Sequence, residues 1–170
     1  MPNQPTQEMF ENILAYELRK LSQFPLSGGE GATWLEDESQ RIGHVNIPKE
    51  LWKKMRNSPV YFLDIPFEER LKHITEEYGS LDIVRMKDAI GRIKEKLGGL
   101  NAKTAIQLLD EGNTLESFRI LLKYYDKYYL KGLHNRENLD TLLHSIVCKS
   151  VTPENAAPLI LQSKQQPQKV

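Results

Sequence analysis

Apolar side chains recur at helical spacing over several stretches of the chain, and these stretches predict helices. Thr6 is a suitable N-cap for a first helix that extends to about Leu21. Its apolar residues are expected to form one buried stripe, made of Phe10, Ile13, Leu14, Leu18 and Leu21. The same spacing predicts a short helix after Pro48 and longer helices at 67–78, 81–97, 101–111, from Thr114 onward, and from 152 to about 161. Gly79 is expected to end the helix at 67–78, and Asn101 and Thr114 are expected to cap the two helices that begin there.

Three short apolar runs between these helices predict strands, at residues 32–35, 60–63 and 143–150. The run at 60–63 is apolar throughout, so we expect it to be covered on both faces. Alternation of strands with helices indicates an α/β fold with a parallel sheet, about three short strands and predominant helices. A single domain is expected over residues 1–162, followed by a polar, disordered tail at 163–170.

The composition is that of an ordinary globular protein. Of the 170 residues, 39% are hydrophobic, and 23 Lys and Arg balance 23 Asp and Glu. No apolar run approaches the roughly 20 residues of a membrane helix, and the polar N-terminus shows no signal peptide. We therefore expect a cytoplasmic protein without a membrane partner. The single cysteine, Cys148, excludes an internal disulfide, and its apolar setting predicts a small buried hydrophobe rather than a nucleophile.

The charges are unevenly distributed. Residues 1–48 carry seven acidic and three basic side chains, whereas residues 81–103 carry six basic and three acidic ones. A basic helix at 81–97 could contact the phosphates of a nucleic acid, or could be a solvated amphipathic helix. The tyrosines at 124, 125, 128 and 129 could stack on bases or pack with their hydroxyls at the rim of a core.

Acidic residues follow two of the predicted strands. Glu36, Asp37 and Glu38 follow the run at 32–35, and Asp64 follows the run at 60–63. In parallel sheets ligands bind at this end of the strands, and an acid there can hold hydrated magnesium beside a phosphate. The chain contains no G-x-x-x-x-G-K-[ST] loop, so ATP hydrolysis by this chain alone is not expected. Arg70, on the following helix, could meet phosphate or pair with a nearby acid.

Five blocks in sequence order resemble the C-terminal P-loop domain of bacterial tRNA 2-selenouridine synthases. The most specific block is Trp34-Leu-Glu-Asp-Glu-Ser-Gln-Arg-Ile-Gly43. The others begin at Gln4 (containing Q-x-x-F-E-N-x-L from Gln7 to Leu14), at Val60 (ending F-E-E-R-L), at Ile93 (I-K-E-K-L-G-G) and at Leu122 (L-K-Y-Y-D-K-Y). Together the blocks span residues 4–162.

The resemblance implies a tRNA-modifying transferase that converts wobble 2-thiouridine to 2-selenouridine through a geranylated intermediate, with geranyl diphosphate and then selenophosphate as donors. Such enzymes pair a rhodanese-like domain, which carries an essential cysteine, with the P-loop domain. In the family the glycine-rich loop and the rhodanese-like domain precede the block at Gln4. We therefore expect a partial P-loop NTPase-like domain whose strands at 32–36 and 60–64 lack their usual central neighbour. That predicts a marginal or rearranged monomer, or one completed by a rhodanese-like chain, a missing N-terminal part or another copy.

The resemblance also implies roles for particular residues. Magnesium would be held near Glu36, Asp37 and Glu38, beside a nucleotide or diphosphate ligand in the intact enzyme. Phosphate would be contacted by Arg70 and by Arg41, although Ser39-Gln40-Arg41 departs from members with arginine directly after the serine. The tRNA would be contacted by Arg92, Lys94, Lys96 and Tyr124. Two alternatives stay open: a small nucleotide- or phosphate-binding module related to monophosphate kinases, and a non-catalytic helical partner subunit.

Overall fold

The computed structural model describes residues 4–23, 33–155 and 157, and these divide into two compact units. The first unit comprises residues 1–61, 136–144 and 156–170, and the second comprises 62–135 and 145–155. The predicted tail at 163–170 and the residues after Ala157 lie outside the described residues. Among the described residues, no helix has the length and apolar character needed to cross a membrane.

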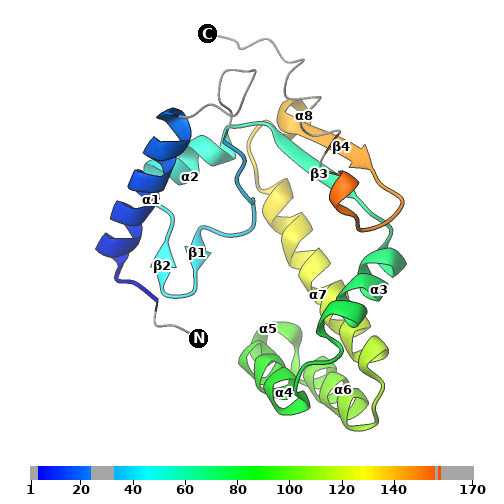
Figure 1. Ribbon diagram of the computed structural model, residues 1–170. Helices are drawn as coiled ribbons and strands as arrows, with labels where there is room; N and C mark the ends of the chain where they lie inside the picture. Colours follow the sequence, from blue (N-terminus) through cyan, green and yellow to red (C-terminus); the bar gives the residue numbers. More distant parts are fainter. Residues whose placement is uncertain (1–3, 24–32, 156, 158–170) are drawn as a thin grey trace. The chain divides into compact units, whose positions relative to one another are not determined.

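The first unit begins with helix α1 (Gln7–Gln23), followed by a hairpin of β1 (Arg41–Ile42) and β2 (Val45–Asn46) and by helix α2 (Lys49–Arg56), all labelled in Figure 1. Thr6 caps α1 as predicted, since its hydroxyl accepts from the Met9 N–H at 3.3 Å. The helix α8 (Leu139–Leu142) also belongs to this unit.

Two glutamines at the start of the chain hold the hairpin. The Gln7 side-chain amide donates to the Asn46 carbonyl and accepts from the Asn46 N–H, both at 2.8 Å. The Gln4 amide likewise donates to the Ile42 carbonyl at 3.1 Å and accepts from the His44 N–H at 2.8 Å. The turn between the strands requires Gly43, because its φ is +61° and a Cβ there would lie 2.3 Å from the Gln4 amide oxygen.

The second unit is helical and contains the main hydrophobic core. Its helices are α3 (Phe67–Tyr78), α4 (Ile83–Arg92), α5 (Lys94–Leu97), α6 (Gly99–Asp110) and α7 (Thr114–His134), followed by a 3₁₀ turn at Pro153–Asn155. The buried core draws on α3, α4, α5, α6 and α7, and consists of Leu71, Met86, Ile90, Leu97, Ala102, Ala105, Leu109 and Phe118. Inside it the buried Ser117 hydroxyl donates to the Ala105 carbonyl at 2.9 Å, which joins α7 to α6.

Strands β3 (Val60–Asp64) and β4 (Leu143–Val147) form a two-stranded parallel sheet. The Cys148 N–H donates to the Asp64 carbonyl at 2.9 Å, which continues the pairing just past the end of β4. Cys148 is buried as predicted, although it follows the strand. A mostly helical α/β fold with a small parallel sheet is confirmed. The prediction that β3 is covered on both faces is wrong, because only Val60 is buried and the next three residues are half-buried.

Four other local predictions are corrected. Residues 33–37 form no regular strand, and Trp34 and Leu35 are 46% and 44% exposed. The stripe on α1 is not buried, since Ile13 and Leu21 are 48% and 50% exposed. Periodicity locates the apolar side of a helix but cannot show whether another element covers it. The expected helix 81–97 is divided at Ile93, just after the weak helix former Gly91, by an i→i+3 bond from the Ile93 N–H to the Ile90 carbonyl.

The fourth correction concerns two helix starts. Asn113, rather than Thr114, caps α7, because its side chain accepts from the Glu116 N–H at 3.3 Å. Asn101 lies inside α6 instead of capping it, and its side chain donates to the Leu97 carbonyl. The left-handed residue Gly98, with φ +92°, allows the chain to turn directly from α5 into α6. Sequence patterns place such boundaries only to within a few residues.

Candidate nucleic-acid interface and phosphate-binding residues

The acidic segment after Trp34 is anchored through one of its three carboxylates. Asp37 forms an ion pair with Arg136 at 2.8 Å, and the Arg136 side chain is 1% exposed. Glu36 and Glu38 remain exposed to solvent. No group of three or more His, Cys, Asp or Glu side chains in the described part of the chain is arranged to hold a metal ion. The magnesium role of these three residues therefore stays a prediction, and Asp37 has a structural partner.

Arg41 lies exposed on β1. Its Nε donates to the Gly43 carbonyl at 2.9 Å, within the same hairpin, and its backbone N–H donates to the Ser39 hydroxyl at 3.2 Å. The side chain thereby supports the turn whose geometry Gly43 permits. A contact between Arg41 and phosphate stays a prediction.

Arg70 forms a two-pronged ion pair with Asp126, which joins α3 to α7. Its two terminal nitrogens donate to the two carboxylate oxygens at 2.6 and 2.9 Å, and its Nε donates to the Ile65 carbonyl at 3.1 Å. The guanidinium also lies 5.7 Å from the centre of the Phe67 ring. The hydrogen bond to Asp126 raises the pKa of Arg70 above its ordinary value. The sequence left open a partner acid or a phosphate for this arginine. The structure supplies the acid, and phosphate binding stays a prediction.

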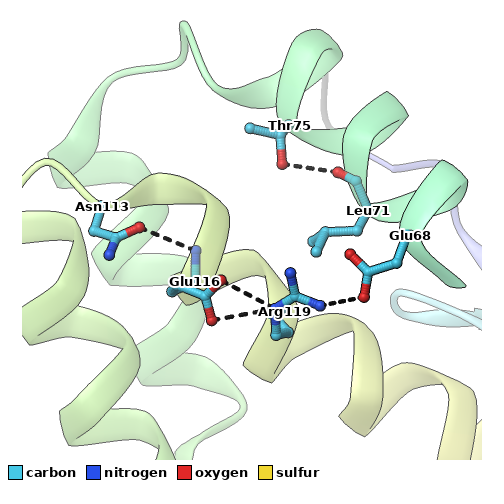
Figure 2. Close-up of polar contacts among 6 residues, drawn as sticks. All are labelled: Glu68, Leu71, Thr75, Asn113, Glu116 and Arg119. Carbon is cyan, nitrogen blue, oxygen red and sulfur yellow. Dashed lines mark hydrogen bonds and ion pairs between the residues drawn. The ribbon is translucent and has the colours of Figure 1, made fainter.

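A second arginine joins the same two helices nearer to the start of α7. Arg119 donates from Nε to the two Glu116 oxygens at 3.1 Å and from a terminal nitrogen to Glu68 of α3 at 2.5 Å (Figure 2). The hydrogen bond from Arg119 lowers the pKa of Glu68 below its ordinary value. Arg119 and Arg70 are therefore cations that internal acids already engage.

The basic residues predicted to contact tRNA are more exposed than these two arginines. Arg92 at the end of α4 and Lys94 and Lys96 on α5 are all exposed, and no carboxylate among the described residues is paired with them. Lys87 of α4, by contrast, is paired with Asp110 of α6. Desolvated or paired cations are poor ligands for an additional anion, whereas exposed, unpaired ones can release counterions from a phosphate backbone.

Tyrosines of α7 adjoin this basic segment. The Tyr128 hydroxyl donates to the Lys96 carbonyl at 3.5 Å, and the Tyr128 ring lies 4.7 Å from the Tyr124 ring. Tyr128 thus brings together Lys96 and Tyr124, which the sequence proposed separately. Tyr124 is half-buried against the core, and desolvation raises the pKa of its hydroxyl above the ordinary value.

Tyr128 was one of four tyrosines that could stack on bases, but only Tyr124 was predicted to contact tRNA. Tyr128 and Tyr125 are 44% and 53% exposed, so they present more ring surface to solvent than the half-buried Tyr124. The signal was available as the i, i+4 spacing of Tyr124 and Tyr128, which puts them on one side of a helix. The same spacing puts the exposed Lys127 and Lys131 next to that side. We call the set Arg92, Lys94, Lys96, Tyr124, Lys127, Tyr128 and Lys131 the α5–α7 surface.

Comparison with known proteins supports the resemblance found in the sequence motifs. Residues 1–82 match the family model described as the tRNA 2-selenouridine synthase AAA domain. Two curated synthases extend the likeness along the chain: that of Aeromonas salmonicida is 30% identical over 162 residues, which cover 78% of this chain and 43% of the relative. The synthase of Hydrogenovibrio crunogenus is 32% identical over 148 residues, which cover 74% of this chain and 40% of the relative.

The family match has defined limits. The chain spans less than half the length of these two synthases. The family model covers Arg41, Arg70 and the acidic segment, whereas the α5–α7 surface lies beyond residue 82. No solved structure matches the chain. The resemblance found in the sequence motifs to tRNA 2-selenouridine synthases is confirmed.

Proposed function

We propose that this chain is the part of a tRNA 2-selenouridine synthase that holds the tRNA, in an enzyme that converts wobble 2-thiouridine to 2-selenouridine through a geranylated intermediate. The match of residues 1–82 to the family model and the names of the relatives support the reaction class. A rhodanese-like chain or segment would supply the reactive cysteine, because the single cysteine of this chain is buried beside β4.

The observation that carries the tRNA role is the α5–α7 surface. Three exposed cations lie on consecutive short segments, and a tyrosine bonded to the Lys96 backbone places exposed aromatic rings beside them. Cations neutralise phosphates and release counterions, and aromatic rings stack on unpaired bases. The combination suits an RNA that offers both a backbone and accessible bases, as the loops of a tRNA do.

A nucleotide or diphosphate ligand with Mg²⁺ is a further element of the proposal, in keeping with a P-loop-type origin of the fold. Magnesium in such sites is bound by one or two carboxylates together with substrate phosphates and water. Glu36 and Glu38 are exposed carboxylates with the right chemistry, and Asp37 would orient the segment through Arg136. Arg41, exposed on the hairpin, is the phosphate contact that remains accessible, because Arg70 is engaged by Asp126.

The test is tRNA binding measured by fluorescence anisotropy over a range of salt concentrations. The triple variant R92A/K94A/K96A should bind more weakly, and the slope of log K against log salt should become shallower by about 0.7–0.9 for each phosphate that the variant no longer neutralises. A control variant, K20A/K72A/K149A, removes three exposed lysines outside the α5–α7 surface and should change the slope less.

A second arm tests the tyrosine. Y128A should weaken binding to unpaired RNA by about 1–3 kcal/mol, the size of one base-stacking contact, with little change in the salt slope. If the triple variant and its control lose the same affinity, the α5–α7 surface is not the tRNA site. Retention of labelled nucleotide without retention of tRNA would favour a monophosphate kinase-like module, and retention of neither would favour a structural subunit.

A further inference from the structure

The helix α2 of the first unit is strongly basic and is not part of the α5–α7 surface. Its eight residues contain four cations, Lys49, Lys53, Lys54 and Arg56, against the single acid Glu50. The three lysines are exposed, and no residue of the helix is buried. No carboxylate in the described part of the chain is paired with any of the three lysines.

Helical geometry places three of these cations on one face. Lys49, Lys53 and Arg56 are spaced i, i+4 and i+7, so they form a row about 10 Å long along one side of α2. The half-buried residues of α2 are Leu51, Trp52, Met55 and Arg56, so Lys49 and Lys53 form the exposed part of the row and Arg56 lies at its edge toward the packed side. Lys54 falls about 100° away from Lys53 and therefore off the row.

An aromatic ring flanks the same row. Trp52 is half-buried, and the Arg56 guanidinium lies 5.7 Å from the centre of its ring. This contact holds Arg56 against the helix, so the exposed Lys49 and Lys53 are the cations of the row that an anion can reach. We call Lys49, Lys53, Arg56 and Trp52 the α2 stripe.

We propose that the α2 stripe is a second contact for the RNA phosphate backbone, separate from the α5–α7 surface. This inference rests on the proposed function. Lys49 and Lys53 are about 6 Å apart along the helix axis, which allows neighbouring phosphates of one strand to be contacted in sequence. The preceding 48 residues are acidic overall, so the stripe is a local basic feature of its unit and not part of a generally positive surface.

Two neighbouring lysines provide a matched comparison. K49A/K53A removes two cations of the stripe. K49A/K54A removes the same total charge from the same helix but only one cation of the stripe, because Lys54 lies off the row. For tRNA binding by the full chain, K49A/K53A should make the salt slope shallower by about 1.4–1.8, since each phosphate contact contributes about 0.7–0.9. K49A/K54A should shift it by about half as much. Equal shifts from the two variants would overturn the stripe geometry.

Trp52 gives a direct signal from the stripe. The chain has two tryptophans, at positions 34 and 52, so W34F leaves Trp52 as the sole tryptophan reporter. Addition of tRNA should change its emission, and the change should disappear in W34F/K49A/K53A at saturating tRNA. Circular dichroism and a thermal melt confirm that each variant is folded. If W34F does not fold, the emission of Trp52 in the W34Y variant replaces it.

The outcomes separate this inference from the proposed function. Weaker tRNA binding by R92A/K94A/K96A with unchanged binding by K49A/K53A would overturn the α2 contact and leave the proposed function standing. The absence of tRNA binding by the unaltered chain would overturn both. Equal binding of poly-glutamate and tRNA to the stripe, read from Trp52, would show a general anion surface and would also overturn the RNA contact.

Discussion

The ion pair between Arg70 and Asp126 offers a test of whether Arg70 holds the fold together or serves a ligand. The pair joins α3 to α7 through two hydrogen bonds of 2.6 and 2.9 Å, and its side chains are 30% and 28% exposed. Fully exposed ion pairs contribute about 0–1 kcal/mol to stability, and breaking a fully buried pair costs about 3–5 kcal/mol. Because this pair is partly exposed, we expect its loss to cost an amount of stability between these two values.

We expect D126N to lower the free energy of unfolding by about 2 kcal/mol, because it keeps the shape of the side chain but removes the charge. R70A should cost somewhat more, about 2–3 kcal/mol, since it also removes the bond to the Ile65 carbonyl and the packing over the Phe67 ring. R70K keeps the charge but cannot make both bonds of the fork, so stability should fall by about 1–2 kcal/mol.

The assay is urea unfolding followed by circular dichroism, which reports on the helices that dominate the second unit. A double-mutant cycle of R70A, D126N and R70A/D126N should give a coupling energy of about 1–2 kcal/mol. A coupling near zero, with no loss of stability in D126N, would refute the structural role. Arg70 would then again be available as a phosphate ligand, and R70A should weaken nucleotide or tRNA binding instead.

Local interactions in the two units lead to three further predictions. G43A should lose about 1–2 kcal/mol of stability on urea unfolding, because φ is +61° and the added Cβ would meet the glutamine side chain that holds the hairpin. D37N should lose about 2–3 kcal/mol in the same assay, since it removes the charge that pairs with the buried Arg136 at 2.8 Å. The hydrogen bond from Arg119 lowers the pKa of Glu68 in the folded protein. The ionised Glu68 therefore stabilises the fold above its unfolded-state pKa, and this stabilisation is lost as the pH falls through its folded-state pKa. E68Q should therefore flatten the acid side of a stability–pH curve.

Features encoded by neighbouring residues were predictable from the sequence. Thr6 caps α1 and Gly79 ends α3, because capping depends on residues within one turn. The strand at Val60–Asp64 also lies where its apolar run predicted it. The parallel α/β character of the sheet followed from the alternation of strands and helices, and it is confirmed by the pairing of β3 with β4.

Features that depend on a distant partner were not predictable. The apolar run around Trp34 is typical of a strand, but among the described residues the segment is not paired with another strand. Instead, the Trp34 ring lies 5.0 Å from the Tyr61 ring. Whether the apolar side of α1 is buried also depends on a covering element that periodicity cannot reveal. The choice between acid and phosphate for Arg70 was open for the same reason, since Asp126 lies 56 residues away in the sequence.

Several of the motif residues that carry the family resemblance are bonded to one another or to the segments next to them. Gln4 and Gln7 hold the hairpin that contains Gly43, which joins the first block to the second. Arg70 and Asp126 join the third block to the last. Where one motif residue forms a hydrogen bond or ion pair with another, the fold alone explains why both are present. Their presence is then weak support for a role in binding a ligand. Functional hypotheses therefore weigh more on polar residues that the fold leaves accessible, which here are the cations of the α5–α7 surface and of the α2 stripe.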